Sequence, residues 1–130
     1  MAYLRWRYVD PPGLDYRAVA LHDGGRLRGL AIGRPRRRGR LRELTLSEVL
    51  VRPGDSGGAR RLLGRARRSG MDHVAAHFAE GTPCRRVGAT SGFLRAPIGM
   101  TLVARVLNDT TVDPSQPSSW RLSVGDLEVF

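Results

Sequence analysis

The residues with the clearest chemical potential are the glycines of the segment RPGDSGG at positions 52–58. The segment has the proline, glycine, aspartate and serine content of a turn, and the residues after it have the apolar spacing of a helix. A helix that begins directly after a glycine-rich turn points several backbone N–H groups at one place, and its dipole adds partial positive charge there. Glycine has no Cβ, so a ligand can approach the backbone closely. This combination predicts a site for a phosphate group.

Two strands and one helix must position this turn. Residues 44–51 (LTLSEVLV) have the alternating, β-branched character of a strand, and residues 71–78 (MDHVAAHF) predict another. Between them, residues 59–70 predict a helix. Its apolar positions share one face: Ala59, Leu62, Leu63 and Ala66. Strand–helix–strand units normally have parallel strands and a right-handed crossover. The alternative interpretation of the turn is an ordinary strand-to-helix connection that binds nothing.

The stretch resembles the acyl-CoA-binding core of the GNAT acyltransferase superfamily. In that family a strand runs into a loop of the form Gln/Arg-x-x-Gly-x-Gly/Ala, and the loop and helix N-terminus hold the CoA pyrophosphate. The matching hexapeptide here is GDSGGA at 54–59, in which Gly57 and Ala59 fit the pattern and Gly54 stands where the family has Gln or Arg. The resemblance covers residues 16–106 and implies a GNAT-like α/β fold, a mixed sheet with a central βαβ unit. It implies acetyl-CoA, or another acyl-CoA, as the cofactor. The implied cofactor-binding residues are Leu50, Val51, Gly54, Asp55, Ser56, Gly57, Gly58 and Ala59.

The resemblance also implies a reaction, in which an acceptor amine attacks the thioester of acyl-CoA. In GNAT enzymes the general base is often a glutamate on or near the strand before the glycine loop, so Glu48 is the first candidate and Glu43 the second. A partly buried carboxylate can have the pKa that this role needs. The alternative for both is a solvent-facing or salt-bridged glutamate beside many arginines. The tyrosine that often acts as general acid in the family has no counterpart in residues 79–93, where Cys84 and Ser91 have no evident activating partner.

Histidine and cysteine offer few metal ligands. His73 and His77 would face the same side of the predicted strand, but a metal needs a third ligand nearby and the sequence places none clearly, so no metal is expected. His77 could instead serve as a base near the acyl site. Cys84 is the only cysteine, which excludes an intrachain disulfide.

The composition predicts one domain over residues 1–130. A hydrophobic content of 41% is enough for a core, and a charged content of 26% is ordinary for a soluble protein. The sequence has no apolar run of about 18 residues that would span a membrane. The opening MAYLRWRY lacks the apolar core of a signal peptide, so we expect a cytoplasmic location.

The net charge of +10 comes entirely from arginine, since all 22 basic residues are arginines. Such a charge favours binding to nucleic acid. The absence of lysine beside abundant glycine, alanine and proline also indicates a GC-rich, bacterial type of genome in which arginine codons replace lysine codons. Positive charge would equally suit an anionic ligand such as CoA.

The chain before the βαβ unit predicts a hairpin and a loop. Residues 15–21 and 27–33 have strand character and are joined by an Asp-Gly-Gly turn. Residues 34–42 (RPRRRGRLR) predict a loop, because Pro35 and Gly39 would interrupt regular structure in its middle. This loop could bind RNA or an acidic surface, or be solvated and mobile. The other expected elements are a short segment at 1–12 that packs its aromatic residues on the sheet, a helix at 83–88, a strand at 100–107, and a strand pair or tail at 120–130.

A complete GNAT domain begins with a strand and one or two helices that shape the acceptor pocket, whereas only residues 1–12 precede the first hairpin here. The chain therefore resembles the C-terminal portion of a GNAT-like protein, a single domain with truncated N-terminal elements. Uncovered apolar sheet surface would favour self-association as a homo-oligomer. Three functions stay open: an acyltransferase acting on acyl-CoA and an amine, an inert GNAT-like module that binds a protein or itself, and, with less support, an arginine-rich nucleic-acid-binding protein.

Overall fold

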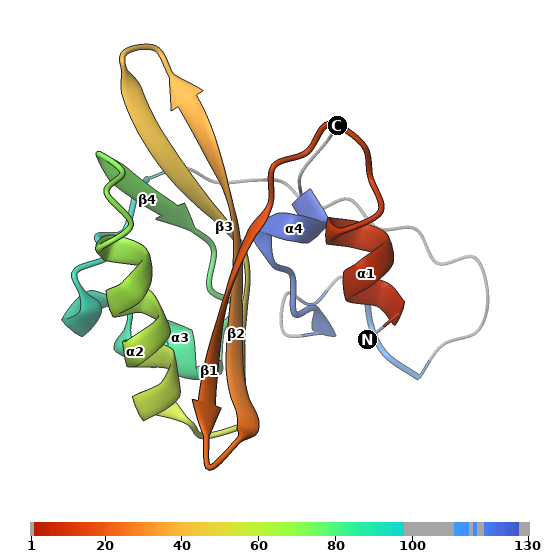
Figure 1. Cartoon of the computed structure of the whole chain (residues 1–130). Helices are drawn as coiled ribbons and strands as arrows, with labels where there is room; N and C mark the ends of the chain where they lie inside the picture. Colours follow the sequence, from red (N-terminus) through yellow and green to blue (C-terminus); the bar gives the residue numbers. More distant parts are fainter. Residues whose placement is uncertain (1, 98–110, 115, 117–118, 128–130) are drawn as a thin grey trace.

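The computed structural model describes residues 2–97, 111–114, 116 and 119–127. Its centre is a four-stranded mixed sheet in the order β1-β2-β3-β4. The strands are β1 (Arg17–Asp23), β2 (Arg26–Arg38), β3 (Leu41–Val51) and β4 (His73–Ala76). The helices are α1 (Ala2–Tyr8), α2 (Ser56–Arg67), α3 (Pro83–Val87), the short 3-10 helix η1 (Ala89–Ser91) and α4 (Val124–Leu127). In Figure 1, α2 and α3 cover one face of the sheet, and α1 and α4 lie on the other.

The predicted βαβ unit is confirmed. β3 and β4 run parallel, from the pair Glu43 and His73 to the pair Leu46 and Ala76, and α2 makes the connection between them. The predicted first hairpin is also confirmed: β1 and β2 are antiparallel and join through Gly24 and Gly25, whose positive φ angles of 53° and 78° suit a tight two-residue turn.

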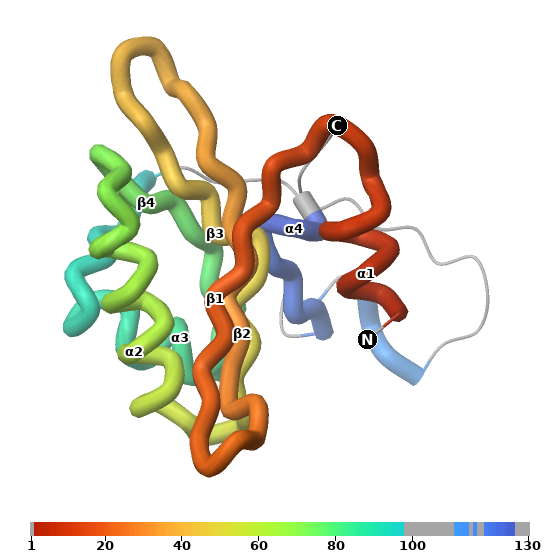
Figure 2. Tube along the Cα trace, in the orientation of Figure 1, coloured from red at the N-terminus to blue at the C-terminus, as the bar shows by residue number. Residues whose placement is uncertain are grey.

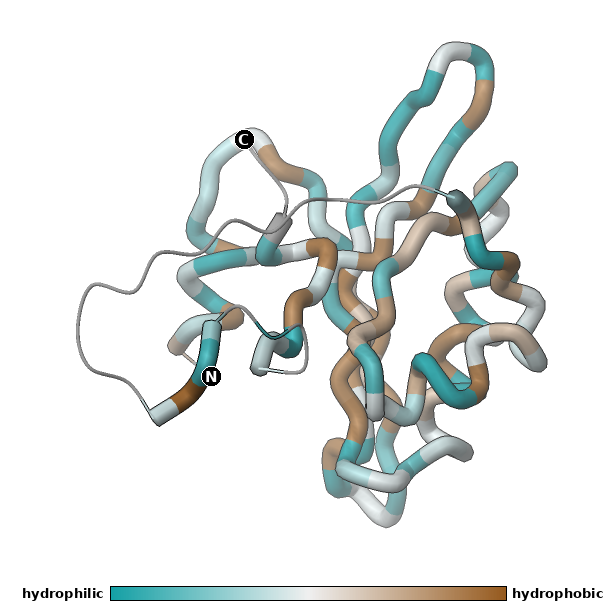
Figure 3. The backbone as a smooth tube through the Cα atoms, turned by 180° about the vertical axis from the view of Figure 1, so that it is seen from behind, coloured by the Kyte–Doolittle hydropathy of each residue, from teal (hydrophilic) through white to brown (hydrophobic). Residues whose placement is uncertain are grey.

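The apolar face of α2 forms the core as its spacing predicts. Leu62 and Leu63 are almost completely buried, and Leu63 packs with Leu44 and Leu46 of β3. The core also takes in the second helix on this face, because Cys84 of α3 packs in the same cluster. Figure 3 shows the apolar segments of the backbone gathered on the strands and the facing helices.

The prediction of a loop at residues 34–42 is wrong. β2 continues to Arg38, β3 begins at Leu41, and Pro35 pairs with Leu44 inside a regular antiparallel ladder. Proline is tolerated here because the pairing of β1 with β2 ends at Gly33, so β2 has a strand on one side only from there on. Gly39 lies at the tip, where its φ of 62° serves the turn. The result is an extended hairpin that projects beyond the rest of the sheet (Figure 2).

The ends of the described chain also differ from expectation. The aromatic residues of the first segment do not all pack on the sheet: the segment forms α1, in which Tyr8 is buried but Trp6 is 65% exposed. Residues 124–127 form α4 where a strand was one expectation. The helix expected at 83–88 is present as α3, with Thr82 as its N-cap. The strand expected at 100–107 lies outside the described residues. No helix in the described part of the chain is long and apolar enough to span a membrane.

Candidate ligand-binding site

The glycine turn ends in an aspartate that caps α2. Oδ1 of Asp55 accepts a hydrogen bond of 2.8 Å from the N–H of Gly58, and the carbonyl of Asp55 accepts one from the N–H of Ala59. A Cβ at Gly58 would lie 2.5 Å from Oδ2 of Asp55, so this position requires glycine. Two of the N–H groups that the sequence assigned to a phosphate are therefore bound within the chain.

An arginine from the neighbouring strand holds this aspartate. Arg28 of β2 makes a bidentate ion pair with Asp55, with distances of 2.7 Å from Nε to Oδ2 and 2.9 Å from Nη2 to Oδ1. The hydrogen bonds from Arg28, and after them the one from Gly58, hold the pKa of Asp55 well below its ordinary value. The carboxylate is therefore charged at neutral pH, and Arg28 compensates its charge.

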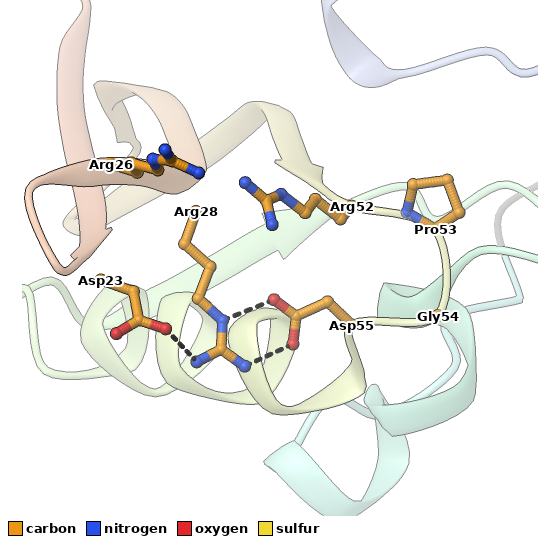
Figure 4. Close-up of a pocket in the computed structure, with 7 residues that line it drawn as sticks. All are labelled: Asp23, Arg26, Arg28, Arg52, Pro53, Gly54 and Asp55. Atoms are coloured by element: carbon orange, nitrogen blue, oxygen red, sulfur yellow. Dashed lines mark hydrogen bonds and ion pairs between the residues drawn. The ribbon is translucent and has the colours of Figure 1, made fainter.

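An arginine-lined depression with a volume of about 550 Å³ lies beside this ion pair (Figure 4). Its walls come from the β1–β2 turn, β2 and the glycine turn: Asp23, Arg26, Arg28, Arg52, Pro53, Gly54 and Asp55. Among the described residues, the side chains of Arg26 and Arg52 have no hydrogen-bond or ion-pair partner. Arg28 is shared between Asp55 and Asp23, so three guanidinium groups face two carboxylates in this lining. The resulting net charge of +1 favours an anion.

The structure brings only some of the predicted cofactor-binding residues to this depression. Gly54 and Asp55 line it. Ser56, Gly57 and Gly58 form the first turn of α2 beside it, while the side chain of Ala59 is completely buried in the core. Sequence reasoning missed Arg26, Arg28 and Arg52. The register of the predicted hairpin could have indicated Arg28, and Arg52 stands within the turn segment itself. Because Gly29 of β2 pairs with Val51, its neighbour Arg28 must come close to the turn that follows β3.

The last two predicted cofactor-binding residues, Leu50 and Val51, lie at the end of β3. They pair with Leu30 and Gly29 of β2. The pairing with β4 stops at Leu46, so no strand in the described part of the chain lies beside residues 48–51 on that side. The N–H and C=O groups of successive residues point to alternate sides of a strand. Some of the N–H and C=O groups of residues 48–51 therefore face this open edge.

Glu48, the first candidate for the general base, lies on the sheet face opposite α2. It is 9% exposed, and its Oε1 accepts hydrogen bonds from the hydroxyl of Tyr8 at 2.8 Å and from that of Ser123 at 2.9 Å. Burial first, and then the hydrogen bond to Glu48, raise the pKa of Tyr8 well above its ordinary value, so Tyr8 stays a donor. Glu48 thus fastens the segments of α1 and α4 to β3. None of the residues described in the structure donates a hydrogen bond to its Oε2.

A β-bulge explains why the second candidate, Glu43, shares this face. The register between β2 and β3 shifts at Ser47, so residues five apart point the same way, and the core-facing residues change from Leu44 and Leu46 to Val49. Glu43 is buried and accepts hydrogen bonds from Thr45 at 2.7 Å and His73 at 2.8 Å. Burial would raise its pKa, but these hydrogen bonds and the arginine charge of Arg38 outweigh burial and lower it.

The remaining candidates show no assembled chemistry. β4 ends at Ala76, so His77 is not on the strand with His73 as predicted. No group of three or more possible metal ligands occurs in residues 2–97 or the other described stretches. Burial raises the pKa of Cys84 to about 11, which keeps its thiol protonated at neutral pH, and Ser91 is buried.

Comparisons with known proteins concern the fold. No protein-family model and no curated protein matches the sequence. Two solved structures of the protein TTHA1254 from Thermus thermophilus are similar to the chain, one of the wild type with a TM-score of 0.52 and one of a point mutant with a TM-score of 0.54. Each is 22% identical in sequence, and the similarity covers 72% of this chain and 72% of that one. The chain therefore shares its mixed α/β fold with TTHA1254.

Proposed function

We propose that this chain is a GNAT-like domain that binds acyl-CoA and transfers the acyl group to an amine. The observation that carries the proposal is the depression beside the glycine turn, with Arg26 and Arg52 unpaired among the described residues. CoA carries a diphosphate and a further phosphate on its ribose. Guanidinium groups bind phosphate oxygens through paired, charge-assisted hydrogen bonds, so two arginines in one depression suit such a ligand.

The phosphate contacts in this proposal differ from those expected from sequence. Asp55 already fills the N-terminus of α2, and a second anion placed against it would be repelled. The phosphates are therefore assigned to Arg26 and Arg52, and Arg28 keeps Asp55 neutralised. The N–H of Gly57 completes the proposed set, because no hydrogen bond within the described residues uses it.

The open edge of β3 supports the second part of the ligand. The pantetheine arm of CoA is extended and contains two amide groups. Such an arm can pair with residues 48–51 in the way that an extended peptide adds to a sheet edge. This edge runs directly into the turn at Arg52–Gly54, so one ligand can contact both.

Glu48 is the proposed base. Both hydroxyl donors use its Oε1, which leaves Oε2 to take the proton of an acceptor amine. α1 and α4 lie on the same face of the sheet as Glu48 (Figure 1), so the proposal assigns the acceptor site to these segments. The proposal takes the acceptor to be an amine because of the resemblance of the sequence to GNAT enzymes.

The test is the melting temperature of the protein with acetyl-CoA, with CoA and an unrelated nucleotide as controls. A ligand that binds only the folded state adds about 2.7 kcal/mol at one hundred times its Kd. We expect acetyl-CoA and CoA to raise the melting temperature, and the double variant Arg26→Ala/Arg52→Ala to lose the shift. The double variant Arg95→Ala/Arg121→Ala removes the same charge from exposed positions outside the depression and should keep it. No shift for the unchanged protein, or equal losses in both variants, would contradict the proposal.

A further inference from the structure

The extended β2–β3 hairpin forms a basic arm, defined here as residues 34–42. Among the described strands, β2 and β3 pair within the arm with each other alone, because β1 ends its pairing at Gly33 and β4 begins its pairing at Glu43. The arm contains no acidic residue. It carries six arginines, namely Arg34, Arg36, Arg37, Arg38, Arg40 and Arg42. Figure 1 shows the arm projecting from the sheet as a two-stranded ribbon.

The charges at the tip of the arm are available to a partner. Arg37 and Arg40 are exposed, and the described residues give neither side chain a hydrogen bond or ion pair. The contacts of the arm with the body are at its base, where Arg42 hydrogen-bonds the carbonyl of Gly70 at 3.0 Å and lies 3.7 Å from Asp72. Arg38 is 61% exposed, but its Nε lies 3.4 Å from Oε1 of the buried Glu43, so it is partly engaged with the body.

The end of α2 extends this positive surface. The contact between Arg42 and Gly70 joins the base of the arm to the turn that follows α2. The last turn of α2 carries Arg65 and Arg67, and Arg68 follows directly. The arginine-lined depression beside the glycine turn lies at the other end of α2, next to its first residues. The arm and the depression are therefore separate surfaces of the molecule.

We propose that the arm binds duplex DNA through its phosphates, with the ribbon entering or following the major groove. This inference does not depend on the proposed function. The major groove of DNA is about 12 Å wide and admits a two-stranded ribbon. The major groove of duplex RNA is too narrow for side chains to read, which favours DNA.

The composition of the arm favours duplex DNA over two other polyanionic partners. A single strand is bound largely by stacking of its bases on aromatic side chains, and the arm has none. Binding to a membrane surface is strengthened by apolar side chains that enter it, and Leu41 is the only large exposed one in the arm. A regular ladder of phosphates remains the partner that matches a rigid ribbon of arginines.

The test measures binding of the full chain to a 20-base-pair DNA duplex by fluorescence anisotropy over a range of salt concentrations. Each phosphate neutralised contributes about 0.9 to the slope of log K against log salt. We expect Arg37→Ser/Arg40→Ser to reduce this slope by about 1.8 and to weaken binding at least tenfold at low salt. The matched control is Arg95→Ser/Arg121→Ser, which removes the same charge from exposed positions outside residues 34–42 and should change both the slope and the affinity much less.

A charge-conserving variant, a stability control and three competitors make the outcome decisive. Arg37→Lys/Arg40→Lys keeps the charge and should keep most of the binding, whereas the serine variant should retain the melting temperature of the unchanged protein because both side chains are exposed. Unlabelled competitors should displace the labelled DNA duplex with different strengths. A matched RNA duplex, a single DNA strand and anionic lipid vesicles should each compete at least tenfold more weakly than the unlabelled DNA duplex. Absence of binding at low salt, equal losses in the arm and control variants, or equal competition by any of these three samples would overturn the proposal.

Discussion

Glu48 has two proposed roles, and substitutions can separate them. Its Oε1 accepts hydrogen bonds from Tyr8 and Ser123, which fastens two segments far apart in the sequence to β3. Its Oε2 is the proposed proton acceptor. Glu48→Gln keeps an oxygen for both hydroxyls but removes the negative charge, so it spares most of the first role and removes the second.

The expected changes in the free energy of unfolding follow from these contacts. Hydrogen bonds to a charged group contribute about 1.5–3 kcal/mol and neutral ones about 0.5–1.5, so Glu48→Gln should cost about 2 kcal/mol over the two bonds. Glu48→Ala leaves both hydroxyls without an acceptor, at about 1–3 kcal/mol each, and should cost about 4 kcal/mol in total. Urea denaturation measures both values, and both are within the stability of about 5–15 kcal/mol that is typical of a domain.

Acyl transfer gives the second readout. A positioned general base contributes about 10²- to 10⁴-fold, so Glu48→Gln should lower kcat by at least about 10² with acetyl-CoA and an amine found by an acceptor screen. Tyr8→Phe is the matched control, because it removes one hydroxyl from the same oxygen and leaves the carboxylate in place. Unchanged turnover in Glu48→Gln would refute the base, and equal stability of Glu48→Ala and Glu48→Gln would refute the fastening role.

Two further predictions concern stability. Leu63→Ala should lower the free energy of unfolding by about 2–5 kcal/mol in urea denaturation, because Leu63 is completely buried between α2 and β3; a loss below about 1 kcal/mol would contradict the packing. The lowered pKa of Glu43 makes its contribution to stability present above the ordinary glutamate pKa of 4.5 and lost as the pH falls through the lower pKa of the folded state. Thr45→Val removes one donor to Glu43 and should therefore flatten the decline in melting temperature below pH 4.5, and an unchanged decline would show that this hydrogen bond is not its source.

The parts of the fold that sequence predicts correctly are those that local pattern determines. Helical spacing identified the buried face of α2, and the Asp-Gly-Gly turn identified the first hairpin. The basic arm was missed because proline and glycine are read as local interruptions. Proline cannot donate a backbone hydrogen bond, so Pro35 interrupts a sheet only if a neighbouring strand lies on the side to which its nitrogen points. Whether such a strand is present depends on where β1 ends its pairing.

The contacts of Glu43 and Glu48 could not be predicted from local sequence either, because they also depend on the pairing of the strands and on distant residues. Nothing near Glu48 in the sequence indicates Ser123, which is 75 positions away. The bulge at Ser47 decides that Glu43 and Glu48 share a face, whereas strict alternation would place residues five apart on opposite faces. A single inserted residue in one strand thus determines which carboxylates are neighbours.

The glycine turn shows how a correct local prediction can leave out contacts made within the chain. The segment does form a turn before a helix, and that helix has an N-terminus with N–H groups to satisfy. The residue that satisfies one of them is Asp55 within the motif, and Arg28, 27 positions earlier, fixes it there. An anion drawn to this place must therefore be bound by side chains that Asp55 does not use. Arg26 and Arg52 are those side chains in the proposed function, so we expect selectivity for a phosphate ligand to depend on two arginines outside the hexapeptide GDSGGA.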